Sequence, residues 1–276
     1  MPRIAKLYLQ TVVYIYRDQE SAKADKVGGG TGFLVARLVD GGYQTFVVTN
    51  RHVIEKMANP VIRLNQYAEE PALYATNRAR WKDHSDGDDI SVYQLDMLTG
   101  EHRHVFFWDT AFLRSDSEYI GLGSDVAMLG RFVGLSGQRE VKPTARFGSI
   151  ASPDIYTEVN SFNEPQQTLV VECHSVPGFS GSPVIAYLPS AALKEPALEN
   201  SGIGPFLLGI VWKHFGSPEE VLDEDGREIG ARVKGNSGLA GVVPAWRISD
   251  VLKMFEPSIS GRFNSAETPK TEHWEK

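Results

Sequence analysis

The chain has 276 residues, of which 42% are hydrophobic and 23% charged, a composition typical of an ordinary globular protein. This length allows one two-lobed domain or two small domains. The formal net charge of −7 argues against nucleic acid as the main partner, because a phosphate-binding surface needs an excess of Lys and Arg. No stretch approaches the roughly 18 apolar residues of a membrane span, so we expect no membrane partner.

The first segment of the chain allows two interpretations. Residues 7–16 are apolar and follow Lys6, a pattern that secretory signal peptides also show. Gln10 interrupts this run, however, and Arg17 and Asp18 stand where a neutral cleavage region belongs. Because the run is rich in Val, Tyr and Ile, we predict a first β-strand over residues 9–16.

Short β-branched segments separated by turn residues predict an all-β protein with few helices. The further predicted strands are 32–38, 44–49, 90–95, 126–132, 146–150, 169–173, 183–186, 206–212 and 238–243. A short helix is predicted over residues 248–255, with Pro257 as its stop. Residues 97–121 are expected to cross between two lobes, residues 190–205 and 215–236 to form long loops, and residues 257–276 to form a flexible tail.

Two side chains at strand ends are candidates for acid–base chemistry. His52 follows a predicted strand that ends at Thr49, so its imidazole is expected at the rim of a sheet, where it can serve as a general base. Asp89 stands at the start of an apolar strand, where it could accept the N–H of His52 and fix its orientation. The alternatives are a surface histidine and an acidic turn over residues 83–89. Asp125 also opens an apolar strand and competes with Asp89.

Ser180 lies in the segment PGFSGSP, residues 177–183. A serine hydroxyl is a weak nucleophile, which needs a base to take its proton and N–H donors to stabilise the oxyanion that forms. Gly178 allows a turn that points backbone N–H groups at one spot, and Gly181 leaves room for a substrate. The alternative is an ordinary Gly/Ser/Pro turn between strands.

Other sequence features point to no cofactor. The glycine-rich residues 28–32 lack the Lys-Ser/Thr pair of a phosphate loop, and His84, His102 and His104 lack a recognised metal-ligand spacing. Cys173 is the single cysteine, so no intramolecular disulfide can form, which favours a cytoplasmic over a periplasmic location. Cys173 and the adjacent His174 are expected to point to opposite faces of a strand, so Cys173 is interpreted as a packing residue.

The order His52, Asp89, Ser180 is that of one of the unrelated catalytic-triad folds. The segments GTGFLV (30–35), VTNRHVI (48–54), DISV (89–92) and GFSGSPV (178–184) resemble the signature blocks of chymotrypsin-fold serine proteases, and are closest to the bacterial Deg/HtrA-type branch. Residues 208–212 resemble the strand that lines the primary specificity pocket. Residues 241–245 resemble the closing segment of the second barrel, and the resemblance covers about residues 7–255.

This resemblance implies two six-stranded antiparallel β-barrels packed together, with the active site in the cleft between them and a short C-terminal helix. Residues 1–120 would form the first barrel with the crossover segment, residues 121–256 the second barrel, and residues 257–276 the tail. The resemblance also favours Asp89 over Asp125, because the segment like 123–134 follows the Asp strand in related sequences.

The implied reaction is peptide hydrolysis through an acyl-enzyme. Ser180 attacks, His52 moves the proton, Asp89 orients His52, and the backbone N–H groups of Gly178 and Ser180 stabilise the oxyanion. The expected partner is a protein or peptide substrate. Any regulator is expected to be a separate chain or a missing fusion, since the sequence has no room for a PDZ-like domain after Lys276. The sequence gives no oligomeric state.

Two residues depart from the pattern of the family. Phe179 and Ser182 replace the usual polar residue and the second glycine around the nucleophile. The zymogen switch of the digestive members pairs a new N-terminus with an Asp at position 179, so we do not expect that switch here. Phe179 is interpreted as packing beneath the oxyanion loop. The rival hypothesis is a catalytically silent or partner-activated binding or signalling module on the same fold.

The resemblance also implies where the substrate side chain binds. The pocket walls would carry His174 and Ser175 before the nucleophile, and Trp212, Lys213 and His214 at the strand end. No carboxylate stands at the base of this pocket, so the residue before the scissile bond is predicted to be small or apolar rather than basic. The acidic residues of 215–236 would attract basic groups further along the substrate, unless that segment is only a solvated hairpin.

Overall fold

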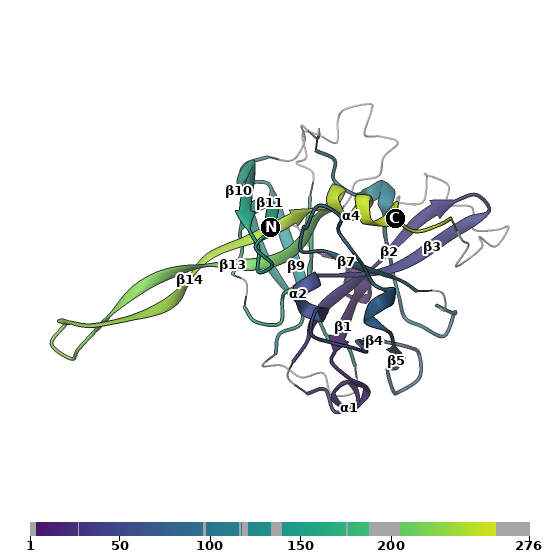
Figure 1. Ribbon diagram of the computed structural model, residues 1–276, viewed down its shortest axis with the longest axis horizontal. Coiled ribbons are helices and arrows are strands. Elements are labelled where there is room, and N and C mark those ends of the chain that lie inside the picture. The colour runs from purple at the N-terminus through teal and green to yellow at the C-terminus, as the bar shows by residue number, and fades with distance from the viewer. Residues whose placement is uncertain are drawn as a thin grey trace.

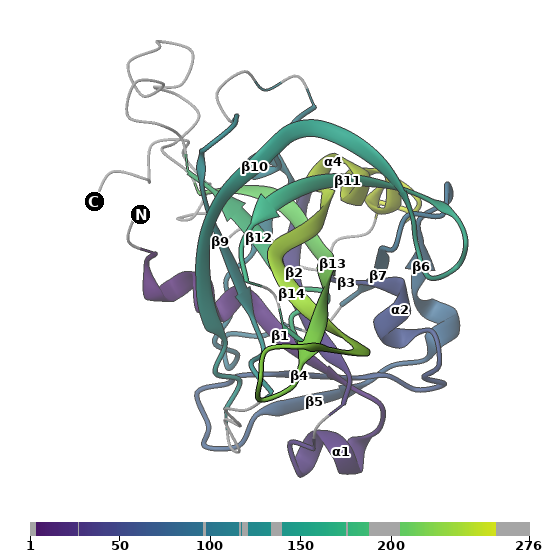
Figure 2. The same ribbon diagram turned by 90° about the vertical axis from the view of Figure 1, so that its left-hand side faces the viewer.

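The computed structural model describes residues 4–26, 28–95, 98–115, 117, 121–133, 140–174, 176–187 and 205–257. The chain folds into two packed β-lobes, as Figures 1 and 2 show from two directions. The double β-barrel architecture with a short C-terminal helix is therefore confirmed. The described residues do not include the predicted boundary at residue 120, residues 190–204 of the predicted loop 190–205, or residues 258–276 of the predicted tail.

The first lobe is a sheet of eight strands in the order β5-β4-β1-β2-β3-β7-β6, with β8 pairing with β2. Its six longer strands are β1 (Val12–Tyr16), β2 (Gly30–Val39), β3 (Gly42–Thr49), β4 (Val61–Leu64), β5 (Ala72–Ala75) and β7 (Ser91–Gln94). Two short strands, β6 (Lys82–Asp83) and β8 (Phe107–Trp108), raise the number above the predicted six. The pairing of β8 with β2 is parallel, whereas the other pairs in this sheet are antiparallel.

The second lobe is a closed barrel of six strands in the order β10-β11-β14-β13-β12-β9, as expected. Its strands are β9 (Asp125–Gly130), β10 (Thr144–Val159), β11 (Pro165–Glu172), β12 (Pro183–Ala186), β13 (Phe206–Leu222) and β14 (Glu228–Pro244). Closure leaves no free sheet edge within the barrel itself.

The helices are short. They are η1 (Lys6–Thr11), α1 (Gln19–Lys23), α2 (Arg51–Ile54), η2 (Arg78–Arg80), η3 (Asp109–Ala111) and α4 (Ala245–Leu252). Residues 9–11, predicted as strand, belong to η1, because the Thr11 hydroxyl donates to the Tyr8 carbonyl and closes a helical turn. In the described part of the chain, no helix is long and apolar enough to cross a membrane.

Residues 215–236 are not the predicted loop. β13 and β14 continue past the barrel as a two-stranded ribbon, which projects from the body of the molecule in Figure 1. Pairing runs from Gly216↔Asn236 to Leu222↔Glu228, and Arg232 forms an ion pair with Glu220 across the ribbon at 2.6 Å. The segment is therefore a β-hairpin, and we call this ribbon the β13–β14 arm.

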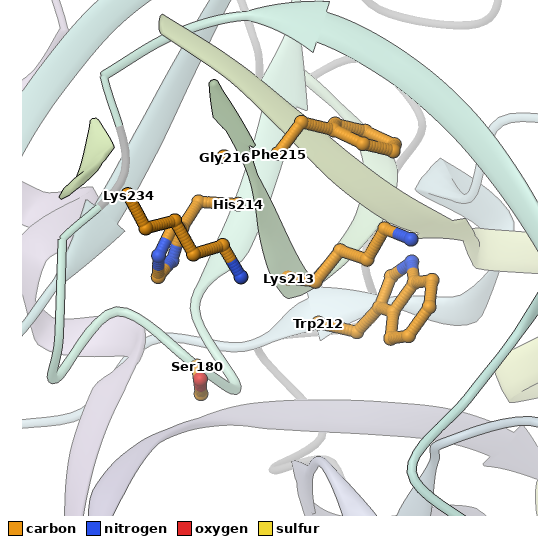
Figure 3. A pocket seen from close by; sticks show the side chains of 7 residues that line it. All are labelled: Ser180, Trp212, Lys213, His214, Phe215, Gly216 and Lys234. Carbon is orange, nitrogen blue, oxygen red and sulfur yellow. The ribbon is translucent and has the colours of Figure 1, made fainter. Parts of the chain in front are cut away.

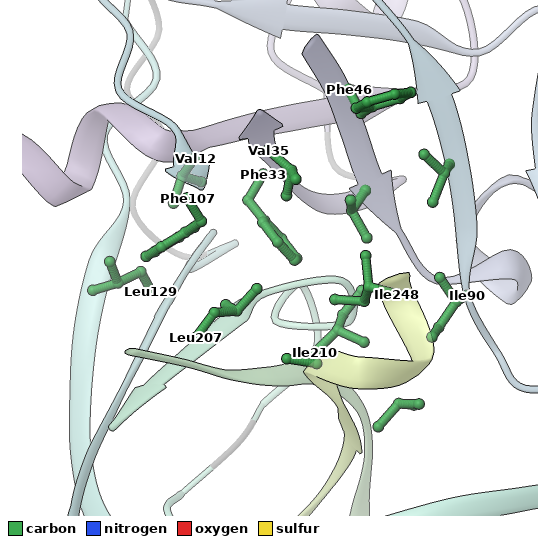
Figure 4. Close-up of a cluster of buried hydrophobic side chains, with 14 of the residues drawn as sticks. Val12, Phe33, Val35, Phe46, Ile90, Phe107, Leu129, Leu207, Ile210 and Ile248 are labelled. Carbon is green, nitrogen blue, oxygen red and sulfur yellow. The ribbon is translucent and has the colours of Figure 1, made fainter. Parts of the chain in front are cut away.

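One hydrophobic core joins the two lobes. Phe33 and Phe46 come from the first lobe, Leu207 and Ile210 from the second, and Ile248 from α4, and all of them are buried in a single cluster (Figure 4). Because both lobes bury apolar area against each other, residues from the two lobes are held in a fixed arrangement where they meet.

Candidate active site

The first candidate side chain, His52, lies on the short helix α2, directly after β3 ends at Thr49. Asn50 precedes this helix, and its side-chain amide donates to the backbone carbonyl of Asp89 over 2.7 Å. This bond fixes the end of β3 to the start of the segment that leads into β7. The two predicted strand-end residues are therefore brought together at one rim of the first lobe.

His52 and Asp89 form a two-point contact. The backbone N–H of His52 donates to Asp89 Oδ1 over 2.9 Å, and the ring Nδ1 lies 2.5 Å from Oδ2. The Asp89 side chain is 1% exposed and the His52 side chain 31%, so the carboxylate is shielded while the imidazole still faces solvent. An ionised carboxylate only accepts, so this contact places the ring proton on Nδ1 and leaves Nε2 as the base. Asp125, the competing aspartate, instead begins β9 in the second barrel, opposite Ser149.

Residues of the second lobe support the Asp89 segment. The side-chain oxygen of Gln166, on β11, accepts the N–H of Asp89 at 2.6 Å, and its amide donates to Asp88 Oδ1 over 2.8 Å. Arg247, on α4, donates to the other oxygen of Asp88. Gln166 and Arg247 were not predicted from the sequence, because nothing in their local pattern marks them as partners of a distant aspartate.

Ser180 lies in a turn that packs against the His52 side of the molecule. Its carbonyl accepts the N–H of Thr31 on β2 at 2.9 Å. A Cβ atom added at Gly30 would come within 3.0 Å of that same carbonyl oxygen and 2.9 Å of Val53, the neighbour of His52. Ser180 and the His52 helix therefore both lie next to Gly30.

The turn before Ser180 is a type II turn. The N–H of Phe179 donates to the Val176 carbonyl over 3.1 Å, Gly178 has φ of +99°, and Pro177 fixes the preceding φ at a negative value. Among the described residues, the N–H groups of Gly178 and Ser180 donate to no protein acceptor. They are therefore available to a bound group, as an oxyanion site requires.

Phe179 packs beneath this turn, as interpreted from the sequence. Its side chain is fully buried in the core of the second barrel, and a Cβ added at Gly130 would come within 2.7 Å of its ring. The guanidinium of Arg146 lies over the ring, 5.2 Å from its centroid. Phe179 therefore anchors the turn through apolar packing.

An open pocket of about 440 Å³ lies beside Ser180. Its other lining residues are Trp212, Lys213, His214, Phe215, Gly216 and Lys234. Figure 3 shows Lys234 and His214 on one side of the pocket and Lys213 and Trp212 on the other.

Lys234 was not predicted as a lining residue, because it belongs to the β13–β14 arm. Its side chain extends back toward Gly216, where an added Cβ atom would touch it. Of the two residues predicted before the nucleophile, His174 is exposed and outside the pocket lining, and Ser175 lies outside the described residues.

The remaining candidates show no site chemistry. Burial raises the pKa of the Cys173 thiol to about 11, so the group is a protonated, unreactive thiol at neutral pH. This agrees with a packing position, since Cys173 belongs to the core of the second barrel. In the part of the chain that the structure describes, no three His, Cys, Asp or Glu residues are grouped as metal ligands.

Comparison with known proteins places the chain in a family. The model for the trypsin-like peptidase domain matches residues 30–187, more than half of the sequence. The chain belongs to the trypsin-like peptidase domain family. The resemblance to chymotrypsin-fold proteases is thereby confirmed, and no curated protein matches the chain in a sequence search.

Solved structures that are described as proteases share the fold of this chain. The MamO protease domain from Magnetospirillum magneticum, in its apo form, is 15% identical with a TM-score of 0.52, covering 92% of this chain and 100% of that one. The Rv3671c protease from M. tuberculosis, in its active form, is 16% identical with a TM-score of 0.52, covering 92% and 85%. The HtrA-type protease AlgW with a tripeptide is 14% identical with a TM-score of 0.51, covering 89% of this chain but only 60% of AlgW.

Proposed function

We propose that this trypsin-like peptidase-domain protein is a serine endopeptidase that uses His52, Asp89 and Ser180 as a catalytic triad. The observation that carries the proposal is the two-point contact of His52 with buried Asp89, next to a type II turn that presents Ser180. The proposed partner is a protein or peptide substrate, and no cofactor takes part in the reaction.

In the proposed mechanism, His52 Nε2 takes the proton of the Ser180 hydroxyl while Oγ attacks the peptide carbonyl. The N–H groups of Gly178 and Ser180 stabilise the tetrahedral oxyanion, and Asp89 stabilises the imidazolium. His52 then protonates the leaving amine, so the peptide C–N bond breaks and an acyl-Ser180 ester remains. Water attacks this ester with His52 again as the base, which releases the carboxylic acid and restores the hydroxyl.

A direct test is hydrolysis of a quenched fluorescent protein substrate such as labelled casein. We expect fluorescence to rise with the wild-type protein and to stay at the background rate with Ser180→Ala. If the folded wild-type protein releases no fragments from casein or from a peptide library, the rival module without peptidase activity is supported.

The lining of the pocket determines the proposed cleavage preference. Lys213 is paired with Glu158 at 2.7 Å, and Lys234 adds an exposed ammonium group beside Ser180. None of the lining residues that the structure describes is acidic, while the rings of Trp212 and Phe215 supply apolar walls. We propose that the residue before the scissile bond is small or apolar and that a basic residue is disfavoured.

The acidic residues at the tip of the β13–β14 arm do not reverse this preference. They are Asp223, Glu224, Asp225 and Glu228. Asp223 is seven residues along the chain from Gly216, which corresponds to more than about 20 Å of extended strand. That distance exceeds the screening length of about 8 Å at physiological salt, so the tip has little electrostatic effect in the pocket.

Charge reversal at Lys234 tests this proposal. Lys234→Glu is expected to raise the kcat/KM of Arg- or Lys-containing library peptides about fivefold relative to Ala peptides, because a repulsive exposed charge becomes attractive. Arg227→Glu is the matched control, since it makes the same charge change at the tip of the same arm, and it should leave the ratio unchanged. A dominant Arg or Lys preference of the wild-type protein would show that this assignment of the pocket is wrong.

The intact chain is expected to be active without removal of N-terminal residues. Phe179 carries no charge, so a newly formed amino terminus would find no partner at that position, and the Thr31 hydroxyl already donates to the Gly178 carbonyl of the active-site turn. Intact-protein mass spectrometry after reaction with a serine-directed probe checks this prediction. We expect the adduct on the full-length chain, and an adduct found only on species trimmed within residues 1–32 would contradict it.

A further inference from the structure

Thr31, on β2, forms two hydrogen bonds with the active-site turn, residues 176–180. Its N–H donates to the Ser180 carbonyl over 2.9 Å, and its hydroxyl donates to the Gly178 carbonyl over 2.7 Å. Both acceptors belong to the residues whose N–H groups are the proposed oxyanion donors. Thr31 is fully buried, so these bonds form away from water, where a hydrogen bond is stronger and an unpaired group is costly.

The backbone of Arg131 sets the direction of the Thr31 hydroxyl. Its N–H donates to Thr31 Oγ1 over 3.0 Å, so the hydroxyl accepts on one side and gives its own proton to Gly178 on the other. The carbonyl of Arg131 also lies against the turn, since a Cβ added at Gly178 would come within 2.7 Å of it. Arg131 therefore restrains Gly178 both directly and through Thr31.

A buried charge pair holds Arg131 in place. Its guanidinium donates to Asp25 Oδ1 over 3.0 Å and to the carbonyls of Lys26 and Gly28 over 3.0 and 3.1 Å. The side chains of Arg131 and Asp25 are 5% and 3% exposed, and Arg63 lies 3.4 Å from the same Asp25 oxygen. Charges this deeply buried persist only with their partners, so Arg131 has little freedom to move.

We propose that Thr31 and Arg131, anchored by Asp25, are positioning residues that hold the turn over residues 176–179 in its type II form. This inference rests on the proposed function, because it assigns the turn to oxyanion stabilisation. The Phe179 side chain supplies only apolar packing. The side-chain hydrogen bond to the turn comes from Thr31 of β2, whose hydroxyl is oriented by Arg131 in the segment after β9. Loss of the Thr31 hydroxyl removes the hydrogen bond to the Gly178 carbonyl. The N–H groups of Gly178 and Ser180 are then no longer held in the orientation that stabilises the developing negative charge.

The matched substitutions Thr31→Val and Thr31→Ser test this inference. Valine keeps the shape of threonine without the hydroxyl, whereas serine keeps the hydroxyl without the methyl group. Steady-state kinetics on one peptide substrate should show kcat of Thr31→Val reduced about tenfold or more with KM changed less than about twofold, because only the transition state uses the oxyanion donors. Thr31→Ser should keep kcat within about threefold of the wild type.

The split between kcat and KM separates positioning from a merely structural effect. The inference is overturned if Thr31→Val keeps the wild-type kcat, if KM rises as much as kcat falls, or if Thr31→Ser loses as much as Thr31→Val. Should Thr31→Val fail to fold, Thr31→Cys replaces it, since a thiol fills the site but is a weak donor, and the same kcat-selective loss is expected. A wild-type protein with no turnover refutes the proposed function together with this inference, whereas an active protein with an unaffected Thr31→Val refutes the inference alone.

Discussion

Ser180→Ala and His52→Ala should each reduce kcat by about 10⁶, and the double variant should be no slower than either single variant. Without His52 no base takes the hydroxyl proton, and without Ser180 the base has no nucleophile to activate, so the two residues act as one unit. The residual rate comes from substrate binding and the oxyanion donors alone. Steady-state hydrolysis of one peptide substrate by the three variants checks the prediction.

Ser182, two residues after Ser180, provides a control for the Ser180 and His52 variants. The hydroxyl of Ser182 is buried without a hydrogen-bond partner among the described residues, so Ser182→Ala removes no described bond and should keep kcat within about threefold. Two results would contradict the account: a single variant with more than about 1% of wild-type activity, or a double variant whose loss is the product of the two single losses.

Asp89→Asn should leave the fold intact and reduce kcat by about 10⁴. The Asp89 carboxylate accepts from His52 at both oxygens, through the backbone N–H and through Nδ1. An asparagine side chain has one acceptor oxygen and one NH₂ group. At one of the two contacts the NH₂ group would therefore face an N–H donor of His52 and form no hydrogen bond. Where the NH₂ faces the ring, Nδ1 must lose its proton to accept, and Nε2 becomes protonated and cannot serve as the base.

Asp125→Asn is the matched control for this prediction, because Asp125 is the other aspartate that opens an apolar strand. It should retain kcat within about threefold, and thermal unfolding of both variants should show folded proteins. A loss of activity in Asp125→Asn with near-full activity in Asp89→Asn would assign the third member of the triad to Asp125.

The features that the sequence predicted are those coded by adjacent residues. The turn before Ser180 has a local signature, because a positive φ favours glycine, here Gly178. The strand that ends before His52 also has one, because its β-branched residues favour strand. The preference for Asp89 over Asp125 came from the resemblance to related sequences. The contact of Asp89 with His52 appears only when β3 and β7 pair.

The features that the sequence did not predict depend on partners far apart in the chain. Thr31 and Arg131 are 100 residues apart, and Asp89 and Gln166 are 77 apart, so no local pattern joins them. The β13–β14 arm was missed for a different reason. Its Gly, Pro and charged residues are typical of loops, and cross-strand pairs such as Glu220 with Arg232 stabilise the ribbon instead.

Reaction of the intact, full-length protein with a fluorophosphonate probe tests the central claim most directly. Such a probe forms a covalent bond only with a serine whose hydroxyl is activated by a base, and proteolysis with mass spectrometry locates the adduct. The account predicts one adduct, on Ser180, which is absent in Ser180→Ala and strongly slowed in His52→Ala and Asp89→Asn. A folded wild-type protein that remains unlabelled, or that is labelled on another serine, would contradict it.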